Sequence, residues 1–192
     1  MQDRALRLNA MRRLVVLVVG MLVAGGGYTQ TAASPGASGP PGSMAPAVAQ
    51  PAELFDFWLG DWKLSWRDAD GSAGTGRNRI TKILDGSVIE ESFEALPGST
   101  PPLLKGRSLS VLSNGVWRQA WADNQGGFFA FTGRAEGDNR IFITATVHRD
   151  GKAFAQRMVF HSIRPDALTW DWESTADDGQ TWALQWRVLY TR

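Results

Sequence analysis

The chain contains no cysteine, only two histidines, and no apolar run long enough to cross a membrane as a helix. The absence of cysteine excludes disulfides, thiol chemistry, Cys-ligated metals and a lipid-modified N-terminal cysteine. The sequence also lacks a Gly-x-Ser-x-Gly elbow, a His-Glu-x-x-His pair and a phosphate-cradling glycine loop that opens a helix. The common motifs of hydrolases, zinc enzymes and nucleotide-binding enzymes are therefore absent.

The N-terminus has the layout of an export signal. Arg4, Arg7, Arg12 and Arg13 precede an apolar stretch over residues 14–24, and small residues follow up to Gly27. This arrangement predicts a signal peptide over 1–27 and a periplasmic or secreted protein, with the start at Met1 or Met11 left open. An apolar stretch of this length falls short of the roughly 20 residues that a membrane helix needs, so no stable span is expected after signal removal.

Residues 28–50 carry no charge and consist mostly of Ala, Pro, Gly, Ser and Thr, which predicts a disordered linker. Residues 51–192 then form one domain of ordinary size, and they hold all nine Trp and all nine Phe. Without the signal, the chain has 16 basic and 18 acidic residues. A basic footprint for nucleic acid is missing, so nucleic acid is not expected as a partner.

Turn signals recur through the domain, and alternating runs separate them. Trp62, Leu64 and Trp66 share one face of the first run, for example, and Asn114-Gly115 is a hairpin signal. The count of runs predicts an all-β fold, a roughly ten-stranded antiparallel up-and-down barrel. Before the first strand, Leu54, Phe57 and Trp58 follow Pro51 at helical spacing, which predicts a short helical plug at one end of the barrel.

Three segments resemble a bacterial family of exported domains of unknown function. They are Phe-Asp-Phe-Trp-Leu-Gly-Asp-Trp at 55–62, the stretch 117–127, and the closing Tyr-Thr-Arg at 190–192. The resemblance implies a calycin-like barrel, related in shape to lipocalins and nitrobindins. It also implies that Trp62 of the Gly-x-Trp motif packs under a basic residue of the final strand, for which Arg187 is the candidate. It carries no catalytic residues.

Several polar residues fall on faces that the alternation places inside the barrel. A charge inside a barrel is costly unless it is paired or hydrated, so these residues mark a candidate ligand site for a small, partly apolar molecule. The candidate ligand-binding residues are Glu91, Arg107, Gln119, Trp121, Asp123, Trp170 and Trp186.

Three other interpretations stay open for these residues. The polar groups can form an internal network in a structural, envelope-associated domain whose lumen is filled by side chains. A register slip of one residue would instead place them in solvent. An enzyme would use Glu91 or Asp123 as general acid or base. The sequence does not identify the ligand or the oligomeric state.

His161 shares a face with Val159 and Ile163, and it is the one candidate for a haem ligand of the nitrobindin kind. The Gly-rich stretch and the Tyr-Pro-Thr segment of nitrobindins are missing after Trp62, and no zinc-ligand spacing occurs. No cofactor and no metal are therefore expected. The pattern Thr175-x-Asp177-x-Gly179-x-Thr181-Trp182 resembles the Asp box of sialidases, which is a hairpin device, and it predicts a turn.

Overall fold

The computed structural model describes residues 50–99 and 103–192. The chain divides into two units, Met1–Pro46 and Ala47–Arg192, and every described residue belongs to the second. The predicted signal peptide and all of the predicted linker except Gln50 lie outside the described residues, so both stay predictions.

The described part is all-β apart from one short 3₁₀ turn, η1 (Asp56–Trp58). Its eleven strands are β1 (Gly60–Arg67), β2 (Ala73–Ile83), β3 (Val88–Ala95), β4 (Lys105–Ser113), β5 (Val116–Asp123), β6 (Phe128–Glu136), β7 (Asn139–Thr144), β8 (Val147–Arg149), β9 (Lys152–His161), β10 (Ala167–Thr175) and β11 (Ala183–Thr191).

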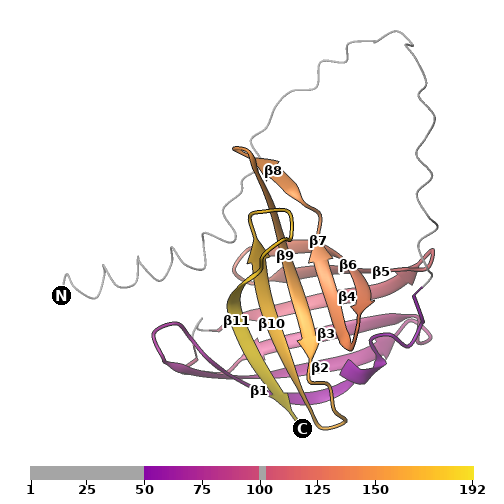
Figure 1. The fold of residues 1–192 in the computed structure, drawn as a ribbon. Helices are drawn as coiled ribbons and strands as arrows, with labels where there is room; N and C mark the ends of the chain where they lie inside the picture. The colour runs from indigo at the N-terminus through magenta and orange to yellow at the C-terminus, as the bar shows by residue number, and fades with distance from the viewer. Residues whose placement is uncertain (1–49, 100–102) are drawn as a thin grey trace, which may run out of the picture. The chain divides into compact units, whose positions relative to one another are not determined.

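Ten of these strands form a closed antiparallel barrel, as predicted. Each strand from β1 to β6 pairs with the next, β7 pairs with β9, and β9, β10 and β11 continue the order. The pairing of β11 with β1 closes the ring, for example at Leu64 and Tyr190. The eleventh strand, β8, pairs only with β9, and in Figure 1 this hairpin projects beyond the barrel wall. Closure removes the free edges of the ten barrel strands, which would otherwise invite aggregation.

The two ends of the barrel differ in what covers them. At one end lie the links β2–β3, β4–β5, β6–β7 and β9–β10, together with the C-terminus (Figure 1). The tight Asn114-Gly115 turn belongs to this end, and both residues have positive φ, 52° and 76°, as a two-residue hairpin requires. The segment 51–59 lies against this end, so we call it the closed end. The opposite end, which we call the open end, holds the remaining links.

The segment 51–59 contains no α-helix. Only η1 forms, because Gly60 with φ 123° already begins β1. Its aromatic side chains nevertheless belong to the core: Phe55 is 0% exposed and Trp58 is 1% exposed. Phe55 stacks on Phe142 with ring centroids 4.3 Å apart, and Trp58 meets Phe160 edge to face at 5.0 Å. The predicted helical plug is therefore absent from the described residues: a single 3₁₀ turn stands in its place, and the rings of Phe55 and Trp58 pack into the barrel core.

The predicted partner of Trp62 is wrong. Arg192, not Arg187, places its guanidinium carbon 4.3 Å from the centroid of the Trp62 ring. Trp62 lies on the inner face of β1, whereas Arg187 lies on the outer face of β11, where it binds Asp171 through two nitrogens at 2.6 and 2.7 Å. Arg192 lies beyond the end of β11 and also donates to the Leu59 carbonyl at 2.6 Å. The C-terminal residue therefore supplies the cation at the closed end.

Candidate ligand site at the open end of the barrel

A buried carboxyl group lies in the middle of the barrel. Glu91 points inward from β3, 6% exposed. Its Oε1 accepts from Asn78 Nδ2 at 2.7 Å, and its Oε2 accepts from the Ser108 hydroxyl at 2.6 Å. Both partners are neutral, so they offset only part of the desolvation of a carboxylate. Burial consequently raises the pKa of Glu91 to about 7, although the two hydrogen bonds act in the opposite direction.

Further polar side chains extend this layer round the wall. Asn78 Nδ2 also donates to the Tyr190 hydroxyl at 3.1 Å, and burial raises the pKa of that phenol, with the charge of Glu91 adding to the effect. On the other side, Gln119 Nε2 donates to Ser110 Oγ at 2.9 Å. We call this layer the polar belt; its members are Asn78, Glu91, Ser108, Ser110, Gln119 and Tyr190.

The polar belt is rich in acceptors and lacks a cation. Asn78 Oδ1 and Gln119 Oε1 are buried without a hydrogen-bond partner. Among the buried residues of the described part there is no Lys, Arg or His. An unsatisfied buried carbonyl costs about 1–3 kcal/mol, so these groups favour a site that receives donors or positive charge.

Five aromatic side chains surround the open end above the polar belt, and each is only partly buried. We call them the open-end aromatic cluster: Trp121, Phe129, Trp170, Trp172 and Trp186. Trp186 has a central position in the cluster, because Trp66, Phe93 and Trp170 meet its ring at 77–87° with centroids 5.3–6.2 Å away. Its Nε1 is buried without a hydrogen-bond partner. At the open end, aromatic rings therefore pack edge to face around Trp186, whose indole N–H is buried and unpaired.

Glycines make room for the large rings near the open end. A Cβ added to Gly106 would lie 2.0 Å from the Trp121 ring, and one added to Gly74 would lie 2.1 Å from the Trp66 ring. Each indole thus lies flat on the backbone of the neighbouring strand, a close approach that only glycine permits. The positions of Trp66 and Trp121 are fixed by these contacts.

Asp123 points inward as predicted, but its carboxylate is occupied by the chain itself. It accepts from Trp121 Nε1 at 3.0 Å and from the backbone N–H groups of Gln125 and Gly127 at 2.9 Å each. These hydrogen bonds stabilise the β5–β6 turn and fix the Trp121 indole at the open end. Asp123 is a positioning residue for the aromatic cluster.

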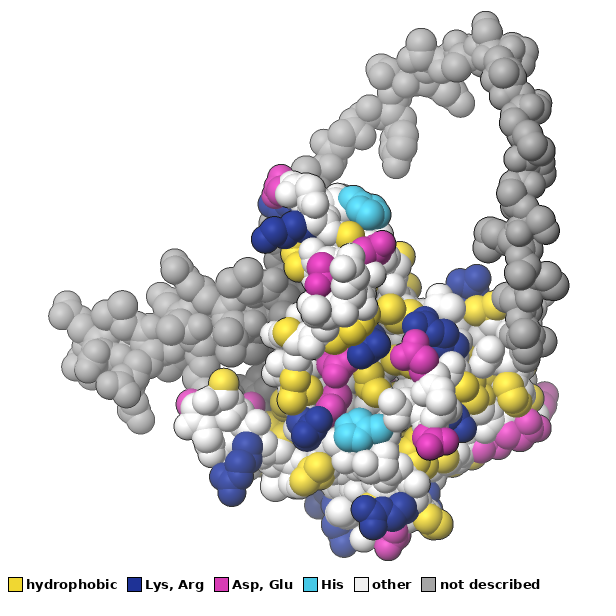
Figure 2. All heavy atoms as spheres, in the orientation of Figure 1, with side chains coloured by type: hydrophobic (Ala, Val, Ile, Leu, Met, Phe, Trp, Pro, Cys, Tyr) yellow, Lys and Arg dark blue, Asp and Glu magenta, His cyan; other side chains and the backbone are white. Residues whose placement is uncertain are grey.

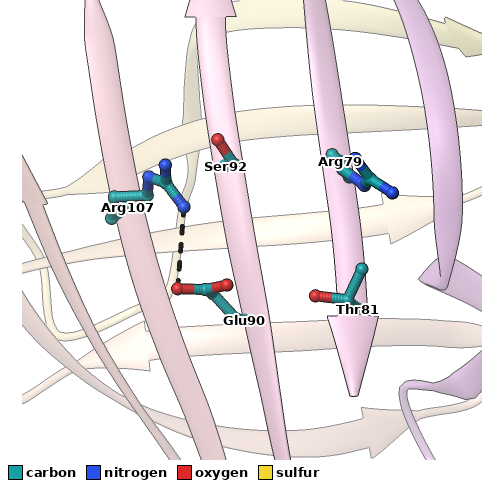
Figure 3. Close-up of a pocket in the computed structure, with 5 residues that line it drawn as sticks. All are labelled: Arg79, Thr81, Glu90, Ser92 and Arg107. Atoms are coloured by element: carbon teal, nitrogen blue, oxygen red, sulfur yellow. Dashed lines mark ion pairs between the residues drawn. The ribbon is translucent and has the colours of Figure 1, made fainter. Parts of the chain in front are cut away.

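The predicted inward orientation of Arg107 is wrong. Strand β4 places Ser108 and Ser110 inside, so Arg107, Leu109 and Val111 lie on the outer face. The prediction failed because the apolar residues of β4 face solvent and its small polar residues face the lumen. This is the reverse of the usual alternation. Figure 3 shows Arg107 on the outside, with a guanidinium nitrogen 3.6 Å from Glu90.

Two hollows are present on this outer wall. One, of about 370 Å³, is lined by Arg79, Thr81, Glu90, Ser92 and Arg107 (Figure 3). The other, of about 410 Å³, adjoins it and is lined mostly by outward-facing residues of β3, β4 and β5. The first hollow lies wholly on the outer wall, whereas the second reaches the open end of the barrel, where the inward-facing Phe93, Gly106 and Asp123 line it.

His161 also lies on the outer face, contrary to the inward position that a haem ligand requires. Its Nε2 lies 3.2 Å from Asp171 Oδ2, and its Nδ1 lies 3.1 Å from Ser162 Oγ. Phe160 and Met158, not His161, are the inward residues of this end of β9. Since both ring nitrogens contact protein groups on the outer wall, the described geometry gives no support to a proximal haem ligand.

The turn predicted from the Asp-box pattern is confirmed. Asp177 Oδ1 accepts from the Thr175 hydroxyl at 2.6 Å and from the Thr181 N–H at 2.9 Å, and these bonds lower the pKa of Asp177 to about 2. Arg157 lies over the Trp182 ring at 4.0 Å. These contacts stabilise the β10–β11 hairpin at the open end.

Most residues of the polar belt were not predicted from the sequence. Asn78 lies between Arg77 and Arg79 in a strand that reads as solvated, and Ser108 and Ser110 look like ordinary surface serines. The register of β3 against its neighbouring strands was the one signal in the sequence that could have identified these residues. Once Glu91 is placed inward, antiparallel pairing places Ile80 and Ser108 directly beside it.

In the described ranges, no group of three or more His, Asp or Glu side chains is arranged to hold a metal ion. The same residues contain no helix that is long and apolar enough to span a membrane. On the face shown in Figure 2, basic and acidic side chains are interspersed, and no area of one sign dominates.

No family model matches this chain, and no curated protein matches it. Among solved structures, it is similar to a de novo designed fluorescence-activating β-barrel. The sequences are 14% identical, the match covers 74% of this chain and 99% of the designed one, and the TM-score is 0.40.

Proposed function

We propose that the domain binds a small, partly apolar molecule at its open end. The observation that supports this proposal most directly is the contrast in exposure between the two ends. At the closed end Phe55 and Trp58 are buried and only Phe57 is partly exposed, whereas five aromatic side chains at the open end stay partly exposed. Clustered aromatic surface that a fold leaves exposed favours a contact with another molecule.

The contacts of the open-end aromatic cluster suit a ligand that combines apolar area with a polar group. The ring faces offer stacking and edge-to-face contact, worth about 0.5–1.5 kcal/mol per aromatic pair beyond burial. Trp186 Nε1 offers a donor that the protein leaves without a partner. A bound acceptor would satisfy that donor and remove its desolvation cost.

The test uses N-phenyl-1-naphthylamine, an uncharged dye whose emission rises in apolar surroundings. We expect saturable binding to the purified domain, with quenching of tryptophan emission. Trp186→Leu and Trp121→Leu should each weaken binding about tenfold or more. Trp182→Leu is the matched control, since Trp182 packs under Arg157 on the outer side and should leave binding within about twofold.

A second candidate is a structural barrel whose lumen is filled by its own side chains. The position of the first hollow on the outer wall and the hydrogen-bonded polar belt favour it. Absence of saturable dye binding, with a folded domain, would decide for this candidate. The enzyme alternative has less support. Asn78 and Ser108 occupy the Glu91 carboxyl group with hydrogen bonds. The Asp123 carboxylate accepts hydrogen bonds from the backbone of its own turn.

We also propose that the protein acts outside the cytoplasm and belongs among calycin-like exported domains. The support is the arginine-led apolar stretch over 14–24 and the motif at 55–62. Cell fractionation with an epitope after Arg192 tests the first proposal. A periplasmic or secreted product shortened by about the length of 1–27 is expected, and a full-length cytoplasmic product contradicts it.

A further inference from the structure

The second hollow, of about 410 Å³, extends from the outer wall to the open end over the adjoining ends of β3, β4 and β5. Its lining residues lie in three successive rows across these strands. The rows are Ser92, Arg107 and Ala122, which face outward; Phe93, Gly106 and Asp123, which face inward; and Glu94, Lys105 and Asn124, nearest the end. A molecule in this hollow would therefore contact both the outer wall and the open end.

The hollow forms because Arg107 has small neighbours. It pairs with Ser92 on β3 and with Ala122 on β5, and neither side chain is large enough to fill the space beside a guanidinium. Gly106, next to it on β4, has no side chain, and the Trp121 ring covers its inner side. Arg107 and Ser92 also line the first hollow, so the two hollows meet at Arg107 (Figure 3).

The acidic groups of the second hollow already have partners within the protein. Glu94 pairs with Lys105 at 2.7 Å, and the hydrogen bond and the charge of Lys105 lower the pKa of Glu94. The Asp123 carboxylate accepts hydrogen bonds from the Trp121 indole and from the backbone of Gln125. Both carboxylates and Lys105 are therefore engaged without a ligand.

Arg107, in contrast, has no close ionic partner. The carboxylate beside it, that of Glu90, lies 3.6 Å from its guanidinium, which is too long for a hydrogen bond, and the Arg107 side chain is 66% exposed. The Arg187–Asp171 pair, for comparison, is 2.6 Å long. The guanidinium of Arg107 consequently keeps its N–H donors available for another molecule.

We propose that the ligand of the open end carries an anionic group that binds Arg107 where the two hollows meet, while its apolar part contacts the edges of Phe93 and Trp121. This inference deepens the proposed function and rests on it. A guanidinium binds two oxygens of a sulfonate, phosphate or carboxylate at once. Arg107 lies two residues from Lys105, the first residue of β4, so the anionic group binds roughly 7 Å from the end of the strand. The buried polar belt lies deeper in the barrel and takes no part.

The test compares two dyes that differ in one group. The first is N-phenyl-1-naphthylamine, and the second, 1-anilinonaphthalene-8-sulfonate, is the same molecule with a sulfonate added. Both are titrated into the purified protein at low ionic strength, and their fluorescence is measured. We expect the sulfonate dye to bind at least about fivefold more tightly than the uncharged dye, and added salt to remove most of that difference.

Three variants locate the two parts of the ligand. Arg107→Gln should abolish the preference for the sulfonate dye and leave the affinity for the uncharged dye within about twofold. Arg118→Gln is the matched control, because it removes the same charge from the outer face of β5 but lines neither hollow, and it should keep the preference. Trp121→Leu should weaken the binding of both dyes about tenfold, since both place their rings at the open end. The salt titration of the wild-type protein needs no variant.

The outcomes separate the two proposals. Equal affinity for both dyes, or a sulfonate preference that survives in Arg107→Gln, overturns the anion inference and leaves the proposed binding function standing. An equal loss of the preference in Arg118→Gln also overturns it, because the net charge of the protein would then explain the attraction. If Trp121→Leu leaves the affinity for the sulfonate dye unchanged, the anion binds apart from the open end, and the inference is wrong. If neither dye binds, both proposals fall.

Discussion

The two ends of the barrel use the same kind of side chain for different purposes. At the closed end, Phe55 and Trp58 are buried by the segment that leads into β1, and Trp62 Nε1 donates to the Trp58 carbonyl at 2.7 Å. At the open end, Trp186 is partly exposed, and its Nε1 lacks a partner, as the Nε1 of the buried Trp58 also does. Aromatic residues thus stabilise the fold at one end and stay available for contact at the other. Variants at the two ends should accordingly separate stability from binding.

The largest expected effect is Phe55→Ala at the closed end. The ring is completely buried and stacks on Phe142 at 4.3 Å, so its removal leaves a cavity. We expect the free energy of unfolding to fall by about 4 kcal/mol, measured by urea denaturation. Dye affinity of the remaining folded protein should change less than about twofold. A loss of binding larger than that would show that the ends are not independent.

The next effect is the pH dependence that Glu91 imposes on stability. Its pKa is about 7 in the folded state against an ordinary 4.5, so the folded state binds the proton more tightly than the unfolded state. The contribution of Glu91 to the free energy of unfolding is fully present below about pH 4.5 and is lost as the pH rises through about 7. The loss amounts to about 3 kcal/mol.

Glu91→Gln should remove that pH dependence. Urea denaturation at pH 5 and pH 8 is the measurement, and at pH 8 the variant should be at least as stable as the wild type. Glu90→Gln is the matched control, because Glu90 lies on the outer wall beside Arg107. An unchanged pH profile in Glu91→Gln would contradict the buried position of this carboxyl group.

A matched pair of Trp→Phe substitutions compares the ends directly. Trp62→Phe leaves the buried Trp58 carbonyl without its donor and should cost about 2 kcal/mol of unfolding free energy. Trp186→Phe removes an unpartnered N–H and should cost less than about 1 kcal/mol. Thermal or urea denaturation measures both. Equal costs, or the reverse order, would contradict the assignment of the two ends.

The smallest effect concerns Arg192. Its guanidinium lies over Trp62 and donates to the Leu59 carbonyl, but the side chain is exposed. Arg192→Ala should lower the free energy of unfolding by about 1 kcal/mol. Lys63→Ala, on the outer face of β1, is the control and should be neutral within about 0.5 kcal/mol. A cost for Lys63→Ala that matches or exceeds that for Arg192→Ala would contradict the cation–π contact.

The fold was predictable because local signals agreed with one another. Alternation in β1 and the Asn114-Gly115 turn each specify antiparallel hairpins, and a chain of hairpins closes most simply as a barrel. The site was less predictable. Alternation identified Glu91 and Gln119 as inward residues, but in β4 the exposed Leu109 and Val111 reversed the pattern and misplaced Arg107.

The sequence also does not specify whether Arg187 or Arg192 packs on the Trp62 ring. Both are basic residues at the end of the chain, and only the register of β11 against β1, with Lys63 opposite Thr191, brings Arg192 to Trp62. Long-range register depends on packing across the whole barrel, which no local pattern records.

The most direct test of the account uses the nine tryptophan indole N–H signals of the domain, resolved by ¹⁵N NMR and assigned by single substitutions. Saturation with N-phenyl-1-naphthylamine should shift the signals of Trp121, Trp170 and Trp186 and leave those of Trp58 and Trp62 in place. Shifts confined to Trp58 and Trp62, or no shift at any indole at saturating dye, would contradict binding at the open end.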